Sequence, residues 1–398
     1  MEVHTVQREI HTPEGMRDIY NGECRRKKVL QDRLMKMIRS YGFEDIETPI
    51  IEYFDVFSKE VGTTSSRDLY KFFDRIGDTL VLRPDFTPSI ARAVSMYFGD
   101  EKLPVRLCYQ GKTFENRHSY QGRLNESTQI GVEYLKDDSV EADGELLALA
   151  VETLKTAGLK EFQISIGEVN YFKALVEEAG IDTETEENLR TCISNKNPFG
   201  AEEMLDTLEL PEKLRCAFRE FPQLFGGEEI LSKARSLTDN PEALKAVERL
   251  EQIYEVLKLY GVEEYISFDL SMLTKYRYYT GIIFQGFTYG SGEPVLKGGR
   301  YDKLLEHFGV GMPAIGFGVV IEYVMNALDR QDIEIPLTDK KEMIIYTRDC
   351  YAKALALAKE KRASGCFVAL TAWQDGISEK DYRQLADRHA ATCCFVCR

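Results

Sequence analysis

The chain has no long apolar run and no excess of basic residues. No stretch approaches the roughly 18 apolar residues that a membrane-spanning helix requires. The first residues lack the basic-then-apolar pattern of a secretory signal, so the cytoplasm is the expected location. A formal net charge of −15 argues against nucleic-acid binding as a default function, although an acidic protein can still carry a local basic groove.

Cysteine and histidine are too scattered to form a recognisable metal site. The five histidines stand far apart, and only Cys393, Cys394 and Cys397 among the nine cysteines lie close together. A zinc site of the common type needs a second pair of ligands at a suitable spacing, and the sequence does not supply one. We therefore expect no metal centre, and we expect reduced cysteines that serve as apolar residues in a last strand.

What is present is the composition of a globular protein of two or three domains, with 43% hydrophobic and 29% charged residues over 398 positions. Helical spacing of apolar residues predicts helices over 24–40, 87–97 and 141–157. Strand patterns predict a hairpin over 70–83 and strands over 46–53, 106–109, 128–134, 163–166, 265–268 and 282–287. Because these strands do not alternate regularly with crossover helices, we predict an α+β fold with a mostly antiparallel sheet flanked by helices.

Changes in pattern along the chain mark three regions. Residues 1–170 and 259–330 carry the strands and form the predicted body, whereas residues 171–258 have helical periodicity and read as an insertion. A break rich in turn residues near 335–340 precedes a tail with the pattern strand, helix, strand, helix, strand. Residues 341–398 are therefore predicted to form a small C-terminal α/β domain.

Several sequence blocks occur in a fixed order between residues 12 and 325. They are the segments 42–52 (GFEDIETPIIE), 80–87 (LVLRPDFT), 272–280 (MLTKYRYYT), 298–302 (GGRYD) and 313–318 (PAIGFG). Together they resemble the histidyl-tRNA synthetases, a class II aminoacyl-tRNA synthetase family. The resemblance implies a class II synthetase-like body, and it implies self-association through the proline-containing block at 42–52.

The resemblance also implies a pocket for free histidine, whose ammonium and imidazole both need hydrogen-bond partners. The implied partners are Asp85, Thr87 and Gln129 for the ammonium and Glu133 and Tyr279 for the imidazole, with Tyr278 as a wall. The implied pocket-shaping residues are Arg123, Gly298, Gly299 and Arg300. Taken singly, each has a structural alternative: Asp85 as a helix cap, Glu133 as a solvated carboxylate, the tyrosines as ordinary strand aromatics and the glycines as a turn.

Three positions that carry arginine in the synthetases do not carry it here. They are Glu115, Thr274 and Tyr323. Amino-acid activation needs preorganised cations around the triphosphate, and losing one such donor costs roughly 3–4 kcal/mol in the transition state. A shifted alignment could restore one arginine, with Arg117 or Arg277 as candidates, but hardly all three. We therefore expect no activation of histidine by ATP.

A synthetase-like body that keeps its histidine-facing residues resembles the regulatory subunits of ATP phosphoribosyltransferase. The resemblance implies a non-catalytic role in the first step of histidine biosynthesis, a partner in the short-form catalytic subunit, and histidine as an effector. It implies no cofactor. The tail after Lys340 is short for an anticodon-binding domain, so no tRNA binding is expected. The alternatives are an active histidyl-tRNA synthetase, a paralogue that acylates another acceptor, and a standalone histidine sensor.

Overall fold

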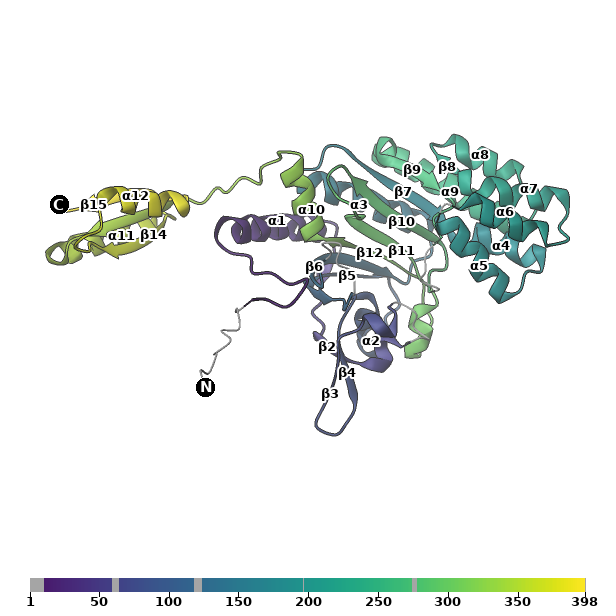
Figure 1. The fold of residues 1–398 in the computed structure, drawn as a ribbon, viewed down its shortest axis with the longest axis horizontal. Coiled ribbons are helices and arrows are strands. Elements are labelled where there is room, and N and C mark those ends of the chain that lie inside the picture. Colours follow the sequence, from purple (N-terminus) through teal and green to yellow (C-terminus); the bar gives the residue numbers. More distant parts are fainter. Residues whose placement is uncertain (1–10, 59–63, 118–123, 196, 274–277, 398) are drawn as a thin grey trace, which may run out of the picture. The chain divides into compact units, whose positions relative to one another are not determined.

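The structure is a computed structural model that describes residues 11–58, 64–117, 124–195, 197–273 and 278–397. The chain divides into two compact units, one containing residues 1–17 and 31–333 and the other residues 18–30 and 334–398. Each is described by itself, and Figure 1 shows the elements of both. No helix within the described ranges has both the length and the apolar content to cross a membrane.

The larger unit is built on a nine-stranded sheet with the order β1-β5-β6-β12-β11-β10-β7-β9-β8 (Figure 1). In chain order the strands are β1 (Glu44–Asp45), β5 (Val105–Phe114), β6 (Glu126–Leu135), β7 (Phe162–Glu168), β8 (Phe225–Gly226), β9 (Ile266–Asp269), β10 (Ile282–Thr288), β11 (Leu296–Arg300) and β12 (Ala314–Val320). Every neighbouring pair from β5 to β7 is antiparallel, and only β1–β5 and β7–β9 are parallel. The predicted fold class, a mostly antiparallel sheet flanked by helices, is confirmed.

Helices cover this sheet because their apolar faces need a partner. The main ones are α2 (Thr87–Tyr97), α3 (Val140–Ala157) and α10 (Ile321–Arg330). Helix α3 begins where the Ser139 hydroxyl accepts a hydrogen bond from the Ala142 N–H, and it ends at Gly158, whose φ of +105° suits glycine. Pro88 stands in the first turn of α2, where its missing N–H costs nothing.

A helical segment follows β7 and packs on the same unit. It consists of α4 (Val169–Ala179), α5 (Thr183–Ser194), α6 (Pro198–Asp206), α7 (Glu212–Glu220), α8 (Glu229–Ser236) and α9 (Pro241–Tyr260). Helix α9 packs against both α3 and α4, so it joins the segment to the helical layer on the sheet. Short 3-10 helices occur at Phe54–Phe57, Ser66–Asp68, Phe221–Gln223, Glu263–Tyr265, Leu304–Phe308 and Arg348–Cys350.

The strand expected over 46–53 is wrong in one respect, because the chain changes sheets there. Strand β1 ends at Asp45, and β2 (Ile51–Tyr53) pairs instead with β4 (Thr79–Leu82) in a three-stranded sheet completed by β3 (Lys71–Phe73). Pro49 lies between the two strands and has no N–H for a ladder. The backbone carbonyl of Thr48 accepts instead from the guanidinium of buried Arg83, at 2.8 Å.

The smaller unit contains a parallel sheet of β14 (Phe367–Ala372), β13 (Lys341–Tyr346) and β15 (Thr392–Val396), with β13 in the centre. Helix α11 (Tyr351–Ala363) packs on the face of Ile344, and α12 (Glu379–Arg388) packs on the face of Met343 and Ile345. The predicted order of strands and helices in the tail is confirmed. Helix α1 (Asn21–Ser40) begins in this unit, where Arg25 pairs with Asp339.

One expectation about the cysteines is corrected. Cys350 and Cys397 form a disulfide that joins the start of α11 to the residue after β15, whereas we expected reduced cysteines throughout. Cys393 and Cys394 are free and half-buried in β15, where they pack as apolar residues.

Candidate functional site

A cavity of about 1190 Å³ lies in the larger unit and is lined by residues from β5, β6, β10, β11 and β12 and from the start of α2. Most of the residues singled out from the sequence line this one cavity. They are Asp85, Thr87, Glu115, Gln129, Tyr278, Tyr279, Gly298, Gly299 and Tyr323. Residues far apart in sequence thus meet because neighbouring strands of the sheet bring them together.

Four predicted site residues are not among those lining this cavity. Glu133 is enclosed behind it, with 1% of its surface exposed. Arg300 faces a second cavity instead, so the structure does not place it as a shaper of the first. Arg123 and Thr274 lie outside the described residues.

Asp85 places a carboxyl group with an altered pKa at one end of the cavity. Its carboxyl group accepts the N–H of Phe86, at 2.7 Å, and that of Thr87, so Asp85 also caps the start of α2 from the position before the N-cap residue Phe86. Burial raises the pKa of Asp85 to about 6, and the nearby negative charge of Glu115 acts in the same direction. A cation bound here would lower this pKa, because an opposite charge favours the ionised carboxylate.

Glu133 on β6 holds two hydroxyl groups that line the cavity. The Thr87 hydroxyl donates to Oε1 at 2.8 Å, and the Tyr301 hydroxyl donates to Oε2. Burial raises the pKa of Glu133 to about 8, so the solvated-carboxylate alternative is excluded. Gly316 on β12 is required opposite it, because a Cβ there would lie 1.8 Å from Oε2.

Tyr278 and Tyr279 form a wall of the cavity that we call the tyrosine wall. Their ring centroids lie 4.4 Å apart, and Tyr301 meets Tyr278 edge-on at 6.1 Å. Neither tyrosine belongs to a strand. Gly299 lies in β11 and not in a turn, and a Cβ there would be 2.6 Å from the Tyr279 ring, so glycine permits this close packing.

Three basic side chains line the cavity among its described residues. The cations that line it there are Arg67, Arg117 and Lys297, and Arg67 and Lys297 are exposed. Arg117, a candidate for a restored synthetase arginine, forms an ion pair with Glu115. Burial raises the pKa of Tyr323, which contacts the same arginine. This candidate for a restored synthetase arginine is therefore already bound to a carboxylate.

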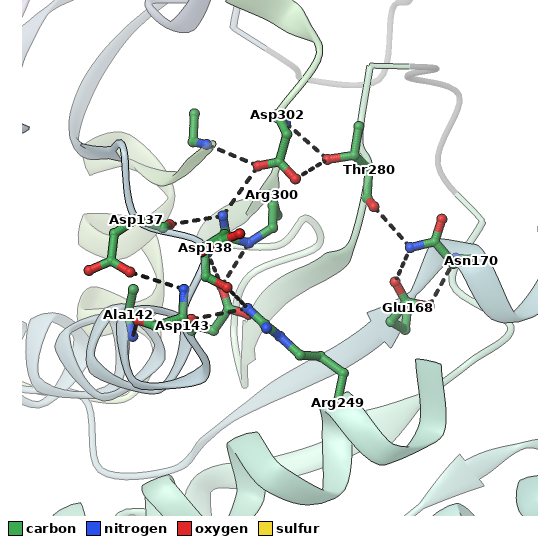
Figure 2. Close-up of polar contacts among 12 residues, drawn as sticks. Asp137, Asp138, Ala142, Asp143, Glu168, Asn170, Arg249, Thr280, Arg300 and Asp302 are labelled. Carbon is green, nitrogen blue, oxygen red and sulfur yellow. Dashed lines mark hydrogen bonds and ion pairs between the residues drawn. The ribbon is translucent and has the colours of Figure 1, made fainter. Parts of the chain in front are cut away.

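A second, smaller cavity of about 370 Å³ lies where the helical segment meets the sheet. Figure 2 shows its polar network, in which Asp143 of α3 accepts from Arg300 at 2.6 Å and also from Arg249 of α9, at 2.5 Å. Thr280 and Asp302 also line it. Neither was predicted as a site residue, although Thr280 ends the block MLTKYRYYT and Asp302 ends the block GGRYD. Their positions at the ends of these blocks were the only sequence feature that could have identified them as site residues.

Comparison with known proteins first defines the class. The sequence model of the family described as histidyl-tRNA synthetase matches residues 15–324. The solved structure of histidyl-tRNA synthetase from Nostoc sp. PCC 7120 shares the fold, with a TM-score of 0.78 at 19% identity over 96% of this chain and 89% of that one. The fold is that of a histidyl-tRNA synthetase-like protein, and the chain belongs to this class.

More similar relatives define the family within that class. The ATP phosphoribosyltransferase regulatory subunit of Acetivibrio thermocellus is 40% identical over 90% of this chain and 86% of its own length. That of Ruminiclostridium cellulolyticum is 38% identical over 93% and 88%. A crystal structure described as an ATP phosphoribosyltransferase regulatory subunit/histidyl-tRNA synthetase from Bacillus halodurans C superposes with a TM-score of 0.86 at 33% identity, covering 98% and 99%. The chain belongs to the family of ATP phosphoribosyltransferase regulatory subunits.

Proposed function

We propose that this chain is the non-catalytic regulatory subunit of an ATP phosphoribosyltransferase and that it binds histidine in the large cavity. The observation that carries the proposal is the pair of carboxyl groups, half-buried Asp85 in the cavity lining and buried Glu133 behind it, beside the tyrosine wall in a chain of this family. Its partner is the short-form catalytic subunit, and both act in the cytoplasm. The same evidence favours this function over that of an active synthetase, since Glu115 and Tyr323 stand where activation needs arginine.

The ligand is oriented by charge. The ammonium lies at Asp85, Thr87 and Gln129, where acceptor oxygens gather and where a cation offsets the cost of a buried carboxylate. The imidazole lies against the tyrosine wall, with the Glu133–Tyr301 pair on its polar side. A site built from buried acceptors discriminates strongly, because a wrong ligand leaves those acceptors unpaired.

Histidine regulates the partner through differential affinity for two states of the complex. A ligand that binds one state more tightly shifts the equilibrium toward it, and the coupling between histidine and the partner is reciprocal. The chain is therefore expected to raise the activity of the short catalytic subunit, and histidine is expected to reduce that activity.

Self-association is supported by exposed apolar side chains around the 42–52 block. On β2, Ile51 is 47% and Tyr53 56% exposed, and Tyr97 at the end of α2 is 73% exposed. Further exposed apolar residues of the same substructure are Ile50, Phe73, Ile76 and Met96. Grouped apolar exposure of this kind marks an interaction surface, and we assign it to a second copy of this chain.

Calorimetric titration with histidine tests the proposal, carried out on the chain alone and together with the short catalytic subunit. Asp85→Asn should weaken histidine binding by about 2 kcal/mol, since it removes the charged partner of the ammonium. Asp78→Asn, which changes an exposed aspartate in the β3–β4 turn, is the matched control and should bind as the wild type does. Absence of histidine binding, or failure to raise the catalytic subunit's activity, would refute the proposal.

A further inference from the structure

Thr280, directly after the tyrosine wall, is held from three sides (Figure 2). Its N–H donates to the Arg300 carbonyl at 2.8 Å, and its hydroxyl donates to Asp302 Oδ2 at 3.0 Å. The same hydroxyl accepts the Asp302 N–H at 2.9 Å, and the Thr280 carbonyl accepts from Asn170 Nδ2 at 2.9 Å. Every polar group of Thr280 is therefore used.

The anchor at Asp302 is itself fixed. Its Oδ1 accepts from the Ala314 N–H at 3.0 Å and from Arg300 Nη1 at 3.2 Å. Arg300 is 5% exposed and donates to Asp143, which is fully buried. Arg300 and Asp143 are the buried part of this network, and Asp302 is half-buried. Because the members bond to one another, moving one group costs another its hydrogen bond.

The second anchor comes from the helical segment. Asn170 stands in the first turn of α4, and its Nδ2 donates to Glu168 Oε1 at 2.8 Å as well as to Thr280. The Val169 N–H donates to the Gly281 carbonyl at 3.2 Å. The start of α4 thus holds the two residues that connect the tyrosine wall to β10.

Thr280 lines the smaller cavity, whereas Tyr278 and Tyr279 line the larger one. The Tyr279 ring packs on Gly299, and the residue after that glycine is Arg300, whose carbonyl holds the Thr280 N–H. The position of the tyrosine wall therefore follows that of Thr280. A hydroxyl that lines the smaller cavity can change binding in the larger one.

We propose that Thr280 is a positioning residue for histidine binding, with Asp302 of the body and Asn170 of the helical segment as its anchors. The inference rests on the proposed function. It assigns the helical segment a part in setting histidine affinity.

Two substitutions at one position separate the hydroxyl from the shape of the side chain. Thr280→Val keeps the branched shape and removes both bonds to Asp302, so histidine binding should weaken on the order of tenfold. Thr280→Ser restores the hydroxyl and should bind histidine as the wild type does. The matched control is Thr288→Val. The Thr288 hydroxyl likewise makes two hydrogen bonds, donating to the Glu161 carbonyl and accepting from Gln331 Nε2, but Thr288 lines neither cavity.

A double-mutant cycle distinguishes positioning from general stabilisation. If Thr280 acts through the tyrosine wall, Thr280→Val should cost no further affinity in a Tyr279→Ala background, whereas independent effects would add. Asn170→Ala, which acts on the carbonyl and keeps the hydroxyl pair, should weaken binding in the same direction and serves if Thr280→Val does not fold.

The outcomes are distinct. Wild-type protein that fails to bind histidine refutes the proposed function. Wild-type binding that persists unchanged in both Thr280→Val and Asn170→Ala overturns the positioning role alone, and so does full additivity in the cycle.

Discussion

Two carboxyl groups, Asp85 and Glu133, dominate the chemistry of the large cavity. Both are protonated more readily than an exposed carboxyl group, because burial raises their pKa values to about 6 and about 8. Near neutral pH the empty site holds a mostly ionised Asp85 and a mostly protonated Glu133. Asp85 therefore supplies a negative charge, whereas Glu133 acts mainly through hydrogen bonds.

These pKa values predict how the stability of the histidine-free protein depends on pH. An acid whose pKa is higher in the folded than in the unfolded chain stabilises the fold below its unfolded pKa, and that stability is lost as the pH rises through the folded value. For Glu133 the pH range in which stability is lost runs from its ordinary pKa of 4.5 to its raised pKa of about 8. The free energy of unfolding should therefore fall across it, as measured by urea titration at a series of pH values.

Substitutions at Glu133 and Asp85 test which carboxyl group causes the fall in stability in each part of the pH range. Glu133→Gln should flatten the fall between about pH 6 and 8, whereas Asp85→Asn should flatten only the part below about pH 6. Equal slopes for wild type and Glu133→Gln between pH 6 and 8 would contradict the assignment.

At the scale of elements, the passage from β1 to β2 carries the chain from the large sheet to the small one. Buried Arg83 bonds to the Thr48 carbonyl in this passage, and buried Glu52 pairs with Arg92 of α2 at 2.8 Å. These contacts hold the small sheet and α2 together while leaving their apolar side chains exposed. The exposed side chains form the surface that we assign to self-association.

Ile51→Glu should therefore weaken the dimer, because it places a charge in an apolar interface. Light scattering across a range of protein concentrations should give twice the mass of one chain for the wild type and a mass nearer one chain for the variant. Leu259→Glu is the matched control, since Leu259 is an apolar residue 88% exposed at the end of α9, away from this surface. A monomeric wild type would contradict the assignment.

At the scale of the whole molecule, histidine binding and ATP chemistry are expected to be separated. The large cavity is lined by the acceptors that we assign to the ammonium and imidazole of histidine, while Arg117 is already paired with Glu115. Histidine-dependent exchange of pyrophosphate with ATP should therefore not rise above the background without protein, even at saturating histidine. Robust exchange would restore the synthetase alternative.

Much of the fold was accessible from the sequence, for local reasons. Periodicity predicted α2 and α3, the β3–β4 hairpin and the order of elements in the tail, because helix and strand periods depend on neighbours along the chain. Most of the site residues implied by the resemblance line the one large cavity, since their order and spacing follow the strands. The strand over 46–53 failed because the choice between two sheets depends on the partners Cys108 and Arg83, which are distant in sequence.

The sequence by itself determined the family, the antiparallel α+β fold and a set of candidate site residues, most of which line one cavity. Only the tertiary structure decided that Glu133 is enclosed by Thr87 and Tyr301, that Arg300 turns to Asp143, and that Cys350 meets Cys397. The reason is physical. Local pattern sets which face of an element a side chain occupies, whereas its partner and its pKa depend on which other element packs against that face.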